Sequence, residues 1–491
     1  MQNIDYDNLR FRRGYLLTSL QVECPFNHNT EAINKDFTLY YHPDLVFTKV
    51  FDKLKSLYLL GDLYDYQDQK ATNVAILNKL ISKDFDALVA GTSIYAGRFV
   101  LIYSGKEGIR LFHDAASLRK IFYVEKSRNQ SCASNPHLLA KAFGFDRTGN
   151  TCWLDFYESD EFIQLFNGNI GYYTLYDEVR QVLPNHYFDL INNKTVRYWP
   201  KEIVEKIDDK EIVRTCAQMI KGFVSAAAFR YPLMIPVTSG YDSRIIYAAT
   251  RDLTKNIFYY INYSEELKGK PDYLIPKKML EDNGRTFNIV IPNNQIEERF
   301  KEKYYYNNPI PHDFFLPVIY NYFLNFSDKI NLPGGFIPVI KSLFDADIKE
   351  ISGRKLARLY KVERFPCAVD FYTNWLNSTQ EICNNLNVDI FDLLYWEDRN
   401  CNWGTQVSQD KDIAQDELLI FNSRLLMATM LNYTRSRRKK PRYELHKEIV
   451  RELWPELLKI PYNPSLKSTI RKYMVNLGLY KPISNIMKHY R

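Results

Sequence analysis

Long apolar runs are missing from this 491-residue sequence, in which no stretch of about 18 consecutive apolar residues occurs. The N-terminal stretch MQNIDYDNLRFRRGYLLTSLQVECPF likewise lacks the apolar core of a signal peptide. CxxC pairs are absent, and the cysteine count of seven is odd, which argues against a zinc site or a disulfide framework. We therefore expect a cytoplasmic protein with no membrane partner and with reduced, scattered cysteines. The cysteines are Cys24, Cys132, Cys152, Cys216, Cys367, Cys383 and Cys401.

Other motifs of chemistry are also missing. The eight histidines show no HExxH or similar ligand spacing, and the lysine-containing phosphate loop GxxxxGK[ST] does not occur. The net charge of +7 is mild, suits an anionic substrate and does not require nucleic acid, so no nucleic-acid partner is expected. The densest basic run, RSRRKKPR at 435–442, leaves two alternatives open: a solvated loop between helices, or a site for a polyanionic substrate or triphosphate.

The chain is long enough for two domains, and its 46% hydrophobic and 25% charged residues are typical of a folded protein. Residues 1–200 favour strands. The segments 97–104 and 108–116 predict a hairpin, 118–126 predicts a further strand, and the NNK of HYFDLINNKTVRYW predicts a second hairpin turn. We place the domain boundary near residue 200, where this β-rich pattern ends, which gives domains 1–200 and 201–491.

After residue 200 the pattern changes to strands that alternate with helices. This alternation predicts a parallel sheet flanked by helices, followed by a mainly helical remainder from about 295. The C-terminal segment 467–491 is basic and is expected to pack against the domain rather than a membrane. The expected helices cover 209–229, 243–251 and 273–283, and the expected strands cover 233–237, 256–263 and 286–292.

The turn TSGYDS at 238–243 connects the first of these strands to a helix. A helix N-terminus offers unpaired N–H groups and partial positive charge to phosphate oxygens. Thr238, Ser239 and Ser243 could add hydroxyl donors, Gly240 would let the backbone approach, and Asp242 could hold a magnesium ion that bridges phosphates. The alternative is a plain helix cap with Ser243 or Asp242 as the N-cap residue.

In its wider context, IPVTSGYDSRIIYAA resembles the SGGxDS loop of the ATP pyrophosphatases, specifically of the asparagine synthetase group that includes β-lactam synthetase. Downstream, NIFYYINYSEELKGKPDYLIPKKMLEDNGRTFNIVIP is similar to that group's next strand, its acid-initiated helix around Asp272 and its following strand. FDLLYWEDRNCNWG and LLIFNSRLLMATML resemble a later pair of segments. Upstream, AGRFVLIYSGKEGIRLFHDAASLRKIFY and LPNHYFDLINNKTVRYW are similar to parts of the group's glutaminase domain.

The resemblance implies an α+β and α/β chain: an N-terminal αββα sandwich of the N-terminal-nucleophile (Ntn) type, then an α/β parallel-sheet synthetase domain like the adenine nucleotide alpha hydrolases, with a helical C-terminal part. It implies an ATP-dependent, AMP-forming ligase that activates a small-molecule carboxylate by adenylation, so that ammonia or a substrate amine then forms an amide. The substrate is expected to be a specialised metabolite or surface-sugar carboxylate rather than aspartate, and a homodimer is left open.

By the same resemblance, the cofactors are ATP and Mg²⁺. ATP and its pyrophosphate would be bound by Thr238, Ser239, Gly240, Asp242 and Ser243, with Asp242 as the metal ligand. Ser239 stands where the family has the first of two glycines. The alternative function is a catalytically inactive nucleotide-binding or scaffold protein of the same fold.

Further departures from the family concern its catalytic groups. Position 2 is Gln2 rather than the family's terminal cysteine, and Cys24 comes too late to replace it, so glutaminase activity is expected to be absent. The family's acidic GEGxDE turn corresponds to INLPGGFIPVIKSLF, which keeps Gly334 and Gly335 but has no acid. No catalytic residue is assigned, and the substitutes left open are the acids Asp345, Asp347, Glu397 and Asp398 and the lysines Lys459 and Lys467.

Overall fold

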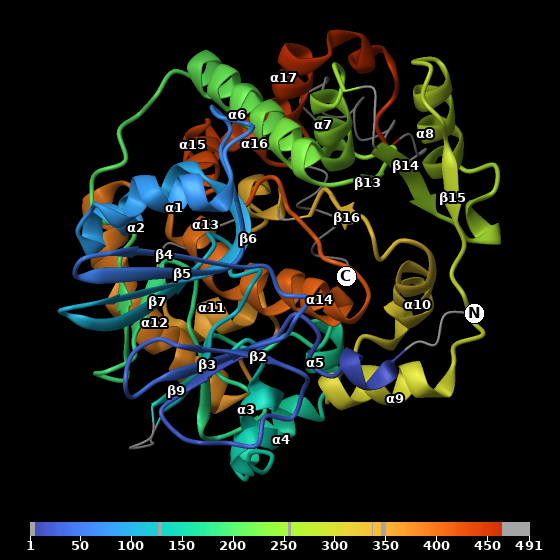
Figure 1. The fold of residues 1–491 in the computed structure, drawn as a ribbon. Coiled ribbons are helices and arrows are strands. Elements are labelled where there is room, and N and C mark those ends of the chain that lie inside the picture. Colours follow the sequence, from blue (N-terminus) through green and yellow to red (C-terminus); the bar gives the residue numbers. More distant parts are fainter. Residues whose placement is uncertain (1–4, 126–129, 254–256, 336, 345–349, 464–491) are drawn as a thin grey trace.

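Two antiparallel sheets of six strands each form the N-terminal part of the computed structural model, which describes residues 5–125, 130–253, 257–335, 337–344 and 350–463 (Figure 1). The first sheet has the order β10 (Val179–Gln181), β8 (Phe122–Val124), β9 (Ser131–Ala133), β1 (Tyr15–Thr18), β3 (Thr38–Tyr41), β2 (Asn29–Ala32). The second has the order β12 (Lys194–Arg197), β11 (His186–Asp189), β7 (Gly108–His113), β6 (Ala96–Gly105), β5 (Lys55–Tyr64), β4 (Phe47–Asp52).

The two sheets pack face to face and are covered by helices, as β5 illustrates. Tyr58 and Leu60 point into the core between the sheets, whereas Leu57 and Leu59 point into a second core under the helices. This alternation is the period of two that a strand imposes on its side chains. The covering helices are α1 (Asn73–Ile81) and α2 (Phe85–Gly91) on one outer face and α3 (Pro136–Phe143) on the other. The result is the αββα layering that the sequence predicted.

Both predicted hairpins are confirmed. β6 and β7 pair antiparallel up to Gly105 opposite Gly108, and β11 pairs with β12 across a turn in which Asn193 has a φ of 47°. Asparagine tolerates this left-handed conformation better than most residues. The strand predicted at 118–126 is the shorter β8, which lies in the other sheet between β10 and β9 rather than beside β7.

A four-stranded parallel sheet follows, and it confirms the predicted alternation. Its order is β15-β14-β13-β16, with β13 pairing with β14 on one side and β16 on the other. In chain order the elements are α6 (Asp209–Arg230), β13 (Leu233–Pro236), α7 (Tyr241–Ala249), β14 (Ile257–Asn262), α8 (Pro271–Glu281), β15 (Asn288–Val290) and β16 (Ile330–Asn331). α6 and α7 pack on the sheet through a core that includes Ile220, Ile235 and Ile245.

The remaining described residues are mainly helical, as predicted. In the part of the chain that the structure describes, no helix is long and apolar enough to span a membrane. The segment 467–491 lies outside the described residues. The helices are α9 (Glu298–Asn307), α10 (Leu316–Asn325), η5 (Ile337–Lys341), α11 (Gly353–Leu359), α12 (Pro366–Leu386), α13 (Ile390–Leu394), the π-helix η6 (Tyr395–Gly404), α14 (Thr405–Asp410), α15 (Arg424–Asn432), α16 (Arg435–Arg438), α17 (Glu444–Leu453) and η8 (Pro455–Lys459).

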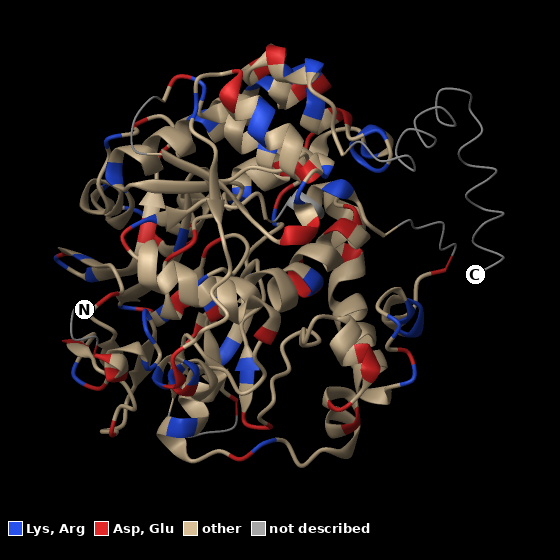
Figure 2. Cartoon of the chain, turned by 90° about the vertical axis from the view of Figure 1, so that its right-hand side faces the viewer, with Lys and Arg blue, Asp and Glu red and all other residues tan. Residues whose placement is uncertain are grey.

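One hydrophobic core joins both halves of the chain. α4 (Thr151–Tyr157) and α5 (Asp160–Gln164) bury Phe156 and Phe162 against Tyr372 and Leu394 of the later helices. This core therefore crosses the boundary placed at residue 200. Basic and acidic residues are interspersed along the elements, as the mild net charge suggests (Figure 2).

The expectation that all cysteines are reduced is wrong for one pair. Cys152 of α4 and Cys367 of α12 form a disulfide across this shared core. Sequence reasoning missed the pair because 215 positions separate the two residues and only tertiary packing brings them together. The other five cysteines are free.

Candidate functional site

The TSGYDS turn lies at the point where the strand order of the parallel sheet reverses. The chain passes from β13 to β14 and β15 on one side, then returns to place β16 on the other side of β13. In open α/β sheets, ligands bind in the crevice outside the carboxyl ends of the strands at such a switch point. Figure 1 shows β13, β16 and α7 gathered there, below α17. The turn is therefore in the position that the fold favours for a ligand.

Within the turn, the hydroxyl groups bind one another and the backbone. Thr238 Oγ1 and Ser243 Oγ are 2.8 Å apart, Thr238 N donates to Ser243 Oγ at 3.1 Å, and Gly240 N donates to Thr238 Oγ1 at 3.2 Å. Thr238 remains exposed, while Ser239 and Ser243 are buried. The structure thus brings the predicted residues into one turn. Their hydroxyl groups are largely bonded within the turn, and Thr238 is the exposed one among them.

The N-cap residue of α7 is Gly240, which has no side chain to cap the helix. The capping alternative, with Ser243 or Asp242 as the N-cap, is therefore wrong. A helix without a side-chain cap leaves its first amides for another acceptor, and a phosphate oxygen is a suitable one because the helix dipole also favours negative charge.

The inner side of the turn is covered by the segment Ile460–Asn463. Arg244, fully buried in α7, donates to the carbonyl oxygens of Ile460 at 2.6 Å and Pro461 at 2.8 Å, and its guanidinium lies 3.7 Å from the ring centroid of Tyr462. Asn463 N donates to the carbonyl oxygen of Ser239 at 3.1 Å. These contacts fix the backbone of the turn.

A neighbouring helix is also tied to the turn. The hydroxyl of Ser239 donates to the carboxylate of Asp272, an exposed residue at the start of α8. The serine that replaces a family glycine therefore has a partner in the acid-initiated helix that the resemblance singled out.

Asp242 is paired with Lys341 and also lies close to His446. Lys341 Nζ lies 2.6 Å from Asp242 Oδ2, and His446 Nε2 of α17 lies 3.4 Å from Oδ1. The side chain of Asp242 is 25% exposed, that of Lys341 is 16% exposed, and that of His446 is fully buried. Burial raises the pKa of Asp242, but His446 and Lys341 outweigh it, and the net pKa is lowered. Asp242 is therefore an anion at neutral pH.

His446 is a buried polar group without a hydrogen-bond partner. Neither ring nitrogen makes a hydrogen bond within the described residues, although Nε2 lies 3.4 Å from Asp242 Oδ1. Burial lowers the pKa of His446, although Asp242 opposes the change. His446 is therefore a buried polar side chain whose nearest charged neighbour is Asp242, at the start of α7.

Asp242 does not fit the metal-ligand role that the resemblance implied. Its Oδ2 is paired with Lys341, and its Oδ1 is a buried atom that lies 3.4 Å from His446 Nε2 without a hydrogen bond. A magnesium ion needs direct access to a carboxylate oxygen at about 2.1 Å. Among the described residues, no group of three or more His, Cys, Asp or Glu side chains could hold a metal ion.

The loop after β16 closes the site from the other side. A Cβ atom on Gly334 would lie 3.0 Å from both the carbonyl carbon of Asp242 and the amide nitrogen of Ser243. Two backbones therefore meet closely at the start of α7, and a side chain at position 334 would force one of them to shift by a few tenths of an ångström.

Three of the acids and lysines left open as catalytic substitutes lie among the described residues. Glu397 and Asp398 are buried in the core shared with α12, where Glu397 binds Arg197 and Asp398 accepts from Tyr372. Lys459 is exposed in η8. Asp345, Asp347 and Lys467 lie outside the described residues.

Sequence reasoning missed both Lys341 and His446. Lys341 lies in the segment INLPGGFIPVIKSLF, whose glycines matched the family, and it is the first charged residue after those glycines, which was the available signal. His446 carried no motif, because its proximity to Asp242 depends on how α17 packs on α7.

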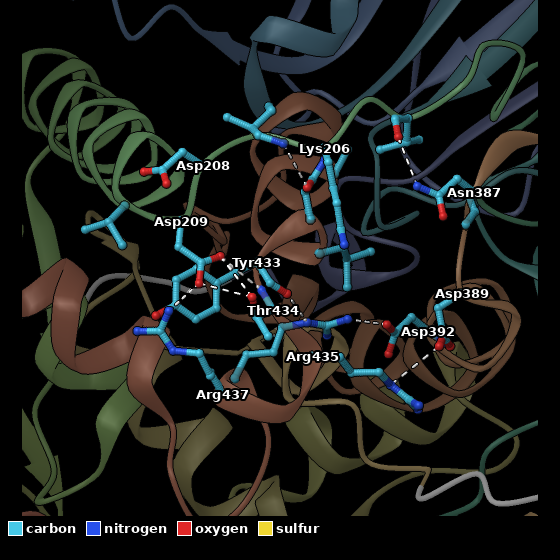
Figure 3. Close-up of a pocket in the computed structure, with 18 of the residues that line it drawn as sticks. Lys206, Asp208, Asp209, Asn387, Asp389, Asp392, Tyr433, Thr434, Arg435 and Arg437 are labelled. Carbon is cyan, nitrogen blue, oxygen red and sulfur yellow. Dashed lines mark hydrogen bonds and ion pairs between the residues drawn. The ribbon is translucent and has the colours of Figure 1, made fainter.

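The basic run 435–442 borders a separate cavity of about 1210 Å³ (Figure 3). Its arginines are largely neutralised: Arg435 lies 3.5 Å from Asp389, Arg437 pairs with Asp209, and Arg438 pairs with Asp392. None of the five predicted turn residues lines this cavity. The three arginines of the run that line the cavity are thus each close to an acidic side chain.

Comparisons with known proteins find little. No protein-family model and no curated protein matches the chain. A solved structure of glutamine phosphoribosylpyrophosphate amidotransferase from B. subtilis, complexed with ADP and GMP, is 10% identical over 61% of this chain and 89% of that chain, with a TM-score of 0.25. A structure described as the allosteric regulatory enzyme of purine biosynthesis is 9% identical over 60% of this chain and 63% of that chain, with a TM-score of 0.24. We base no assignment on similarities this low.

Proposed function

We propose that this chain binds ATP at the β13–α7 turn and acts as an AMP-forming ligase of the asparagine synthetase type. A substrate carboxylate attacks the α-phosphorus, the bond to the bridging oxygen breaks, and pyrophosphate leaves. Ammonia or a substrate amine then displaces AMP from the acyl-adenylate and forms the amide. Such a reaction needs donors placed where negative charge develops on the departing pyrophosphate.

The observation that carries this proposal is the location of an uncapped helix at the switch point of a parallel sheet. The N-cap residue of α7, Gly240, supplies no side-chain cap, and α7 follows β13, the strand that lies between β14 and β16. In the proposed complex, the first amides of α7 bind the pyrophosphate oxygens and exposed Thr238 contributes a hydroxyl. The turn's contacts to Ile460–Asn463 keep this geometry rigid before the nucleotide arrives.

The amine donor is proposed to be free ammonia or a substrate amine, without glutamine hydrolysis. Gln2 lies outside the described residues. Burial raises the pKa of Cys24 to about 12, so this thiol is not a nucleophilic thiolate at neutral pH. The first strand, β1, starts at the fully buried Tyr15, and the segment before it is bound to α9 through Phe11 N and Asn307 Oδ1 at 2.7 Å.

The test is pyrophosphate release from ATP in the presence of a panel of carboxylic acids with ammonia, assayed with and without Mg²⁺. Asp242→Asn should lose activity because the charge that holds Lys341 is removed. Asp252→Asn is the matched control, since Asp252 lies 2.6 Å from Lys221 in a surface pair and should retain activity. No release from any acid by a protein that binds ATP would reject the ligase and leave the alternative.

The alternative is a catalytically inactive protein of the same fold that binds a nucleotide for regulation or assembly. It is favoured by the pairing of Asp242 with Lys341 and by the burial of Glu397 and Asp398, which bind Arg197 and Tyr372. ATP binding without turnover, together with a cellular role that survives Asp242→Asn, would support it.

A further inference from the structure

The carboxylate of Asp242, which the resemblance makes a magnesium ligand, is paired with the ammonium of Lys341 at 2.6 Å. We propose that Lys341 replaces the divalent ion at this site, so that the chain binds the phosphates of a nucleotide, or pyrophosphate, without a metal on Asp242. This inference rests on the proposed ATP site and specifies the ionic form of its ligand.

Hydrogen bonds of the two residues that flank Lys341 in sequence fix the position of its backbone. The carbonyl oxygen of Ile340 accepts from Arg438 Nη1 at 2.9 Å, and Ser342 Oγ donates to Asp392 Oδ1 at 2.8 Å. Arg438 and Asp392 also pair with each other, and both are buried. The backbone that carries Lys341 is therefore anchored, and the ammonium is placed rather than free to swing away.

The ammonium of Lys341 also lies near the aromatic ring of Tyr443. Lys341 Nζ lies 5.7 Å from the ring centroid of Tyr443, whose ring is 4.7 Å from that of Tyr241 at the start of α7. A cation at this distance is attracted to the face of an aromatic ring. Lys341 thus has an anion on one side and an aromatic ring on the other.

A metal ion and this ammonium would compete for one place. A magnesium ion bound to Asp242 Oδ2 would lie within a few ångströms of the Lys341 ammonium, where two cations repel each other strongly in a partly buried site. The second oxygen, Oδ1, makes no hydrogen bond but is buried, 3.4 Å from His446 Nε2. Metal binding at Asp242 would therefore require Lys341 to leave an anchored position.

The ammonium can bind phosphate while it stays on Asp242. A lysine has three N–H donors, and the Asp242 contact uses one of them. The side chain is 16% exposed, so part of it remains accessible to a ligand at the start of α7. Lysine is an established phosphate ligand as a point charge. The chemical class of ligand is accordingly a polyphosphate that carries no essential metal at this position.

The first experiment measures the affinity for ATP and for inorganic pyrophosphate by calorimetry, in Mg²⁺ and in EDTA. The wild-type affinity should differ less than about threefold between the two conditions, and Lys341→Met should lose about tenfold or more in both. Lys221→Met, which removes the surface lysine 2.6 Å from Asp252, is the matched control and should bind like the wild type. Lys341→Arg keeps a cation and should retain metal-free binding.

The second experiment titrates Mn²⁺ alone and follows it by electron paramagnetic resonance. Wild type and Asp242→Asn should bind the same amount of Mn²⁺, because Asp242 is not a metal ligand while Lys341 is present. Lys341→Met should gain a Mn²⁺ site that Lys341→Met/Asp242→Asn lacks. Circular dichroism checks that each variant is folded.

The failures can be told apart. Wild-type nucleotide binding that falls about tenfold or more in EDTA, or a wild-type Mn²⁺ site that Asp242→Asn abolishes, would overturn the Lys341 inference but leave the ATP site intact. Failure to bind ATP or pyrophosphate under either condition would overturn the proposed function and this inference together. Tighter nucleotide binding by Lys341→Met would show that the lysine blocks the site, and would also overturn the inference.

Discussion

Arg98 of β6 and Asp416, which lies between α14 and α15, form an ion pair of 2.7 Å across 318 positions of sequence. Arg98 also pairs with Asp412 at 2.7 Å, and Arg119 lies 3.3 Å from Asp416. Both arginines are buried. Asp416 also accepts a backbone hydrogen bond from Asn331 of β16. The cluster therefore links the second antiparallel sheet to the parallel sheet.

Arg98→Met should destabilise the protein by about 3–5 kcal/mol, because it leaves the carboxylates of Asp412 and Asp416 without their main partner. Urea unfolding followed by circular dichroism measures the change. Arg10→Met is the control, since its ion pair with Asp7 is exposed and should leave the free energy of unfolding nearly unchanged. Equal effects of the two substitutions would contradict the assigned role of the cluster.

Because Cys152 and Cys367 form a disulfide, the number of reactive thiols should depend on whether the protein has been reduced. Denatured, unreduced protein should react with a thiol reagent at five cysteines, and reduced protein at seven. Cys152→Ser should lower the free energy of unfolding by about 2–5 kcal/mol, since the cross-link restricts the unfolded chain. Mass spectrometry of an unreduced digest identifies the linked peptides. Seven reactive thiols without reductant would refute the bond.

Glu397 predicts a dependence of stability on pH. Burial raises the pKa of Glu397, but Arg197 and the hydrogen bond from Asn185 outweigh it, so the pKa in the folded state lies below the ordinary 4.5. A carboxyl group with a lowered folded pKa stabilises the protein above its unfolded pKa and loses that contribution as the pH falls. Glu397→Gln should therefore cost about 3–5 kcal/mol at pH 7, and less as the pH falls below about 4.5.

Urea unfolding of wild type and Glu397→Gln between neutral pH and the acid limit of the folded state measures this difference. Glu161→Gln serves as the control, because its partner Arg364 is exposed and the pair should contribute little. A difference between wild type and Glu397→Gln that stays constant with pH would rule out the titration of Glu397 as its cause.

Gly334 and Gly335 form a matched pair for the candidate site. Gly334→Ala should weaken ATP binding about tenfold or more, because its Cβ would lie 3.0 Å from the backbone of Asp242 and Ser243 and displace the start of α7. Gly335→Ala should bind normally, since its nearest contact would be 3.4 Å from the flexible side chain of Leu419. Calorimetry with ATP compares the two, and equal affinities would show that the start of α7 does not bind the nucleotide.

Glutamine should not be hydrolysed. Purified protein is expected to release no glutamate from glutamine, and the Cys24 thiol should react slowly with iodoacetamide at pH 7 because burial raises its pKa to about 12. A coupled glutamate dehydrogenase assay and mass spectrometry of the alkylated protein measure the two results. Glutamate release that Cys24→Ser abolishes would contradict both statements.

Local patterns determined the succession of elements in this protein. The period-two pattern around the Lys106–Glu107 turn predicted the β6–β7 hairpin, and the helical spacing of Ile212, Cys216 and Phe223 predicted α6. The alternation of apolar runs with helices predicted the parallel pairing of β13 and β14. These features follow from sequence because the backbone period decides which neighbouring side chains share a face.

Only the tertiary structure decided which distant residues meet. Hydrophobic periodicity states that a side chain is buried, not against what, so it could not place β8 in the first sheet or β16 beside β13. For the same reason, the turn at Asp242 was visible in the sequence, whereas the arrival of Lys341 and His446 was not. The chemistry of the site depends on that arrival, because the folding of η5 and α17 onto α7 places two nitrogens against the carboxylate that a metal would otherwise need.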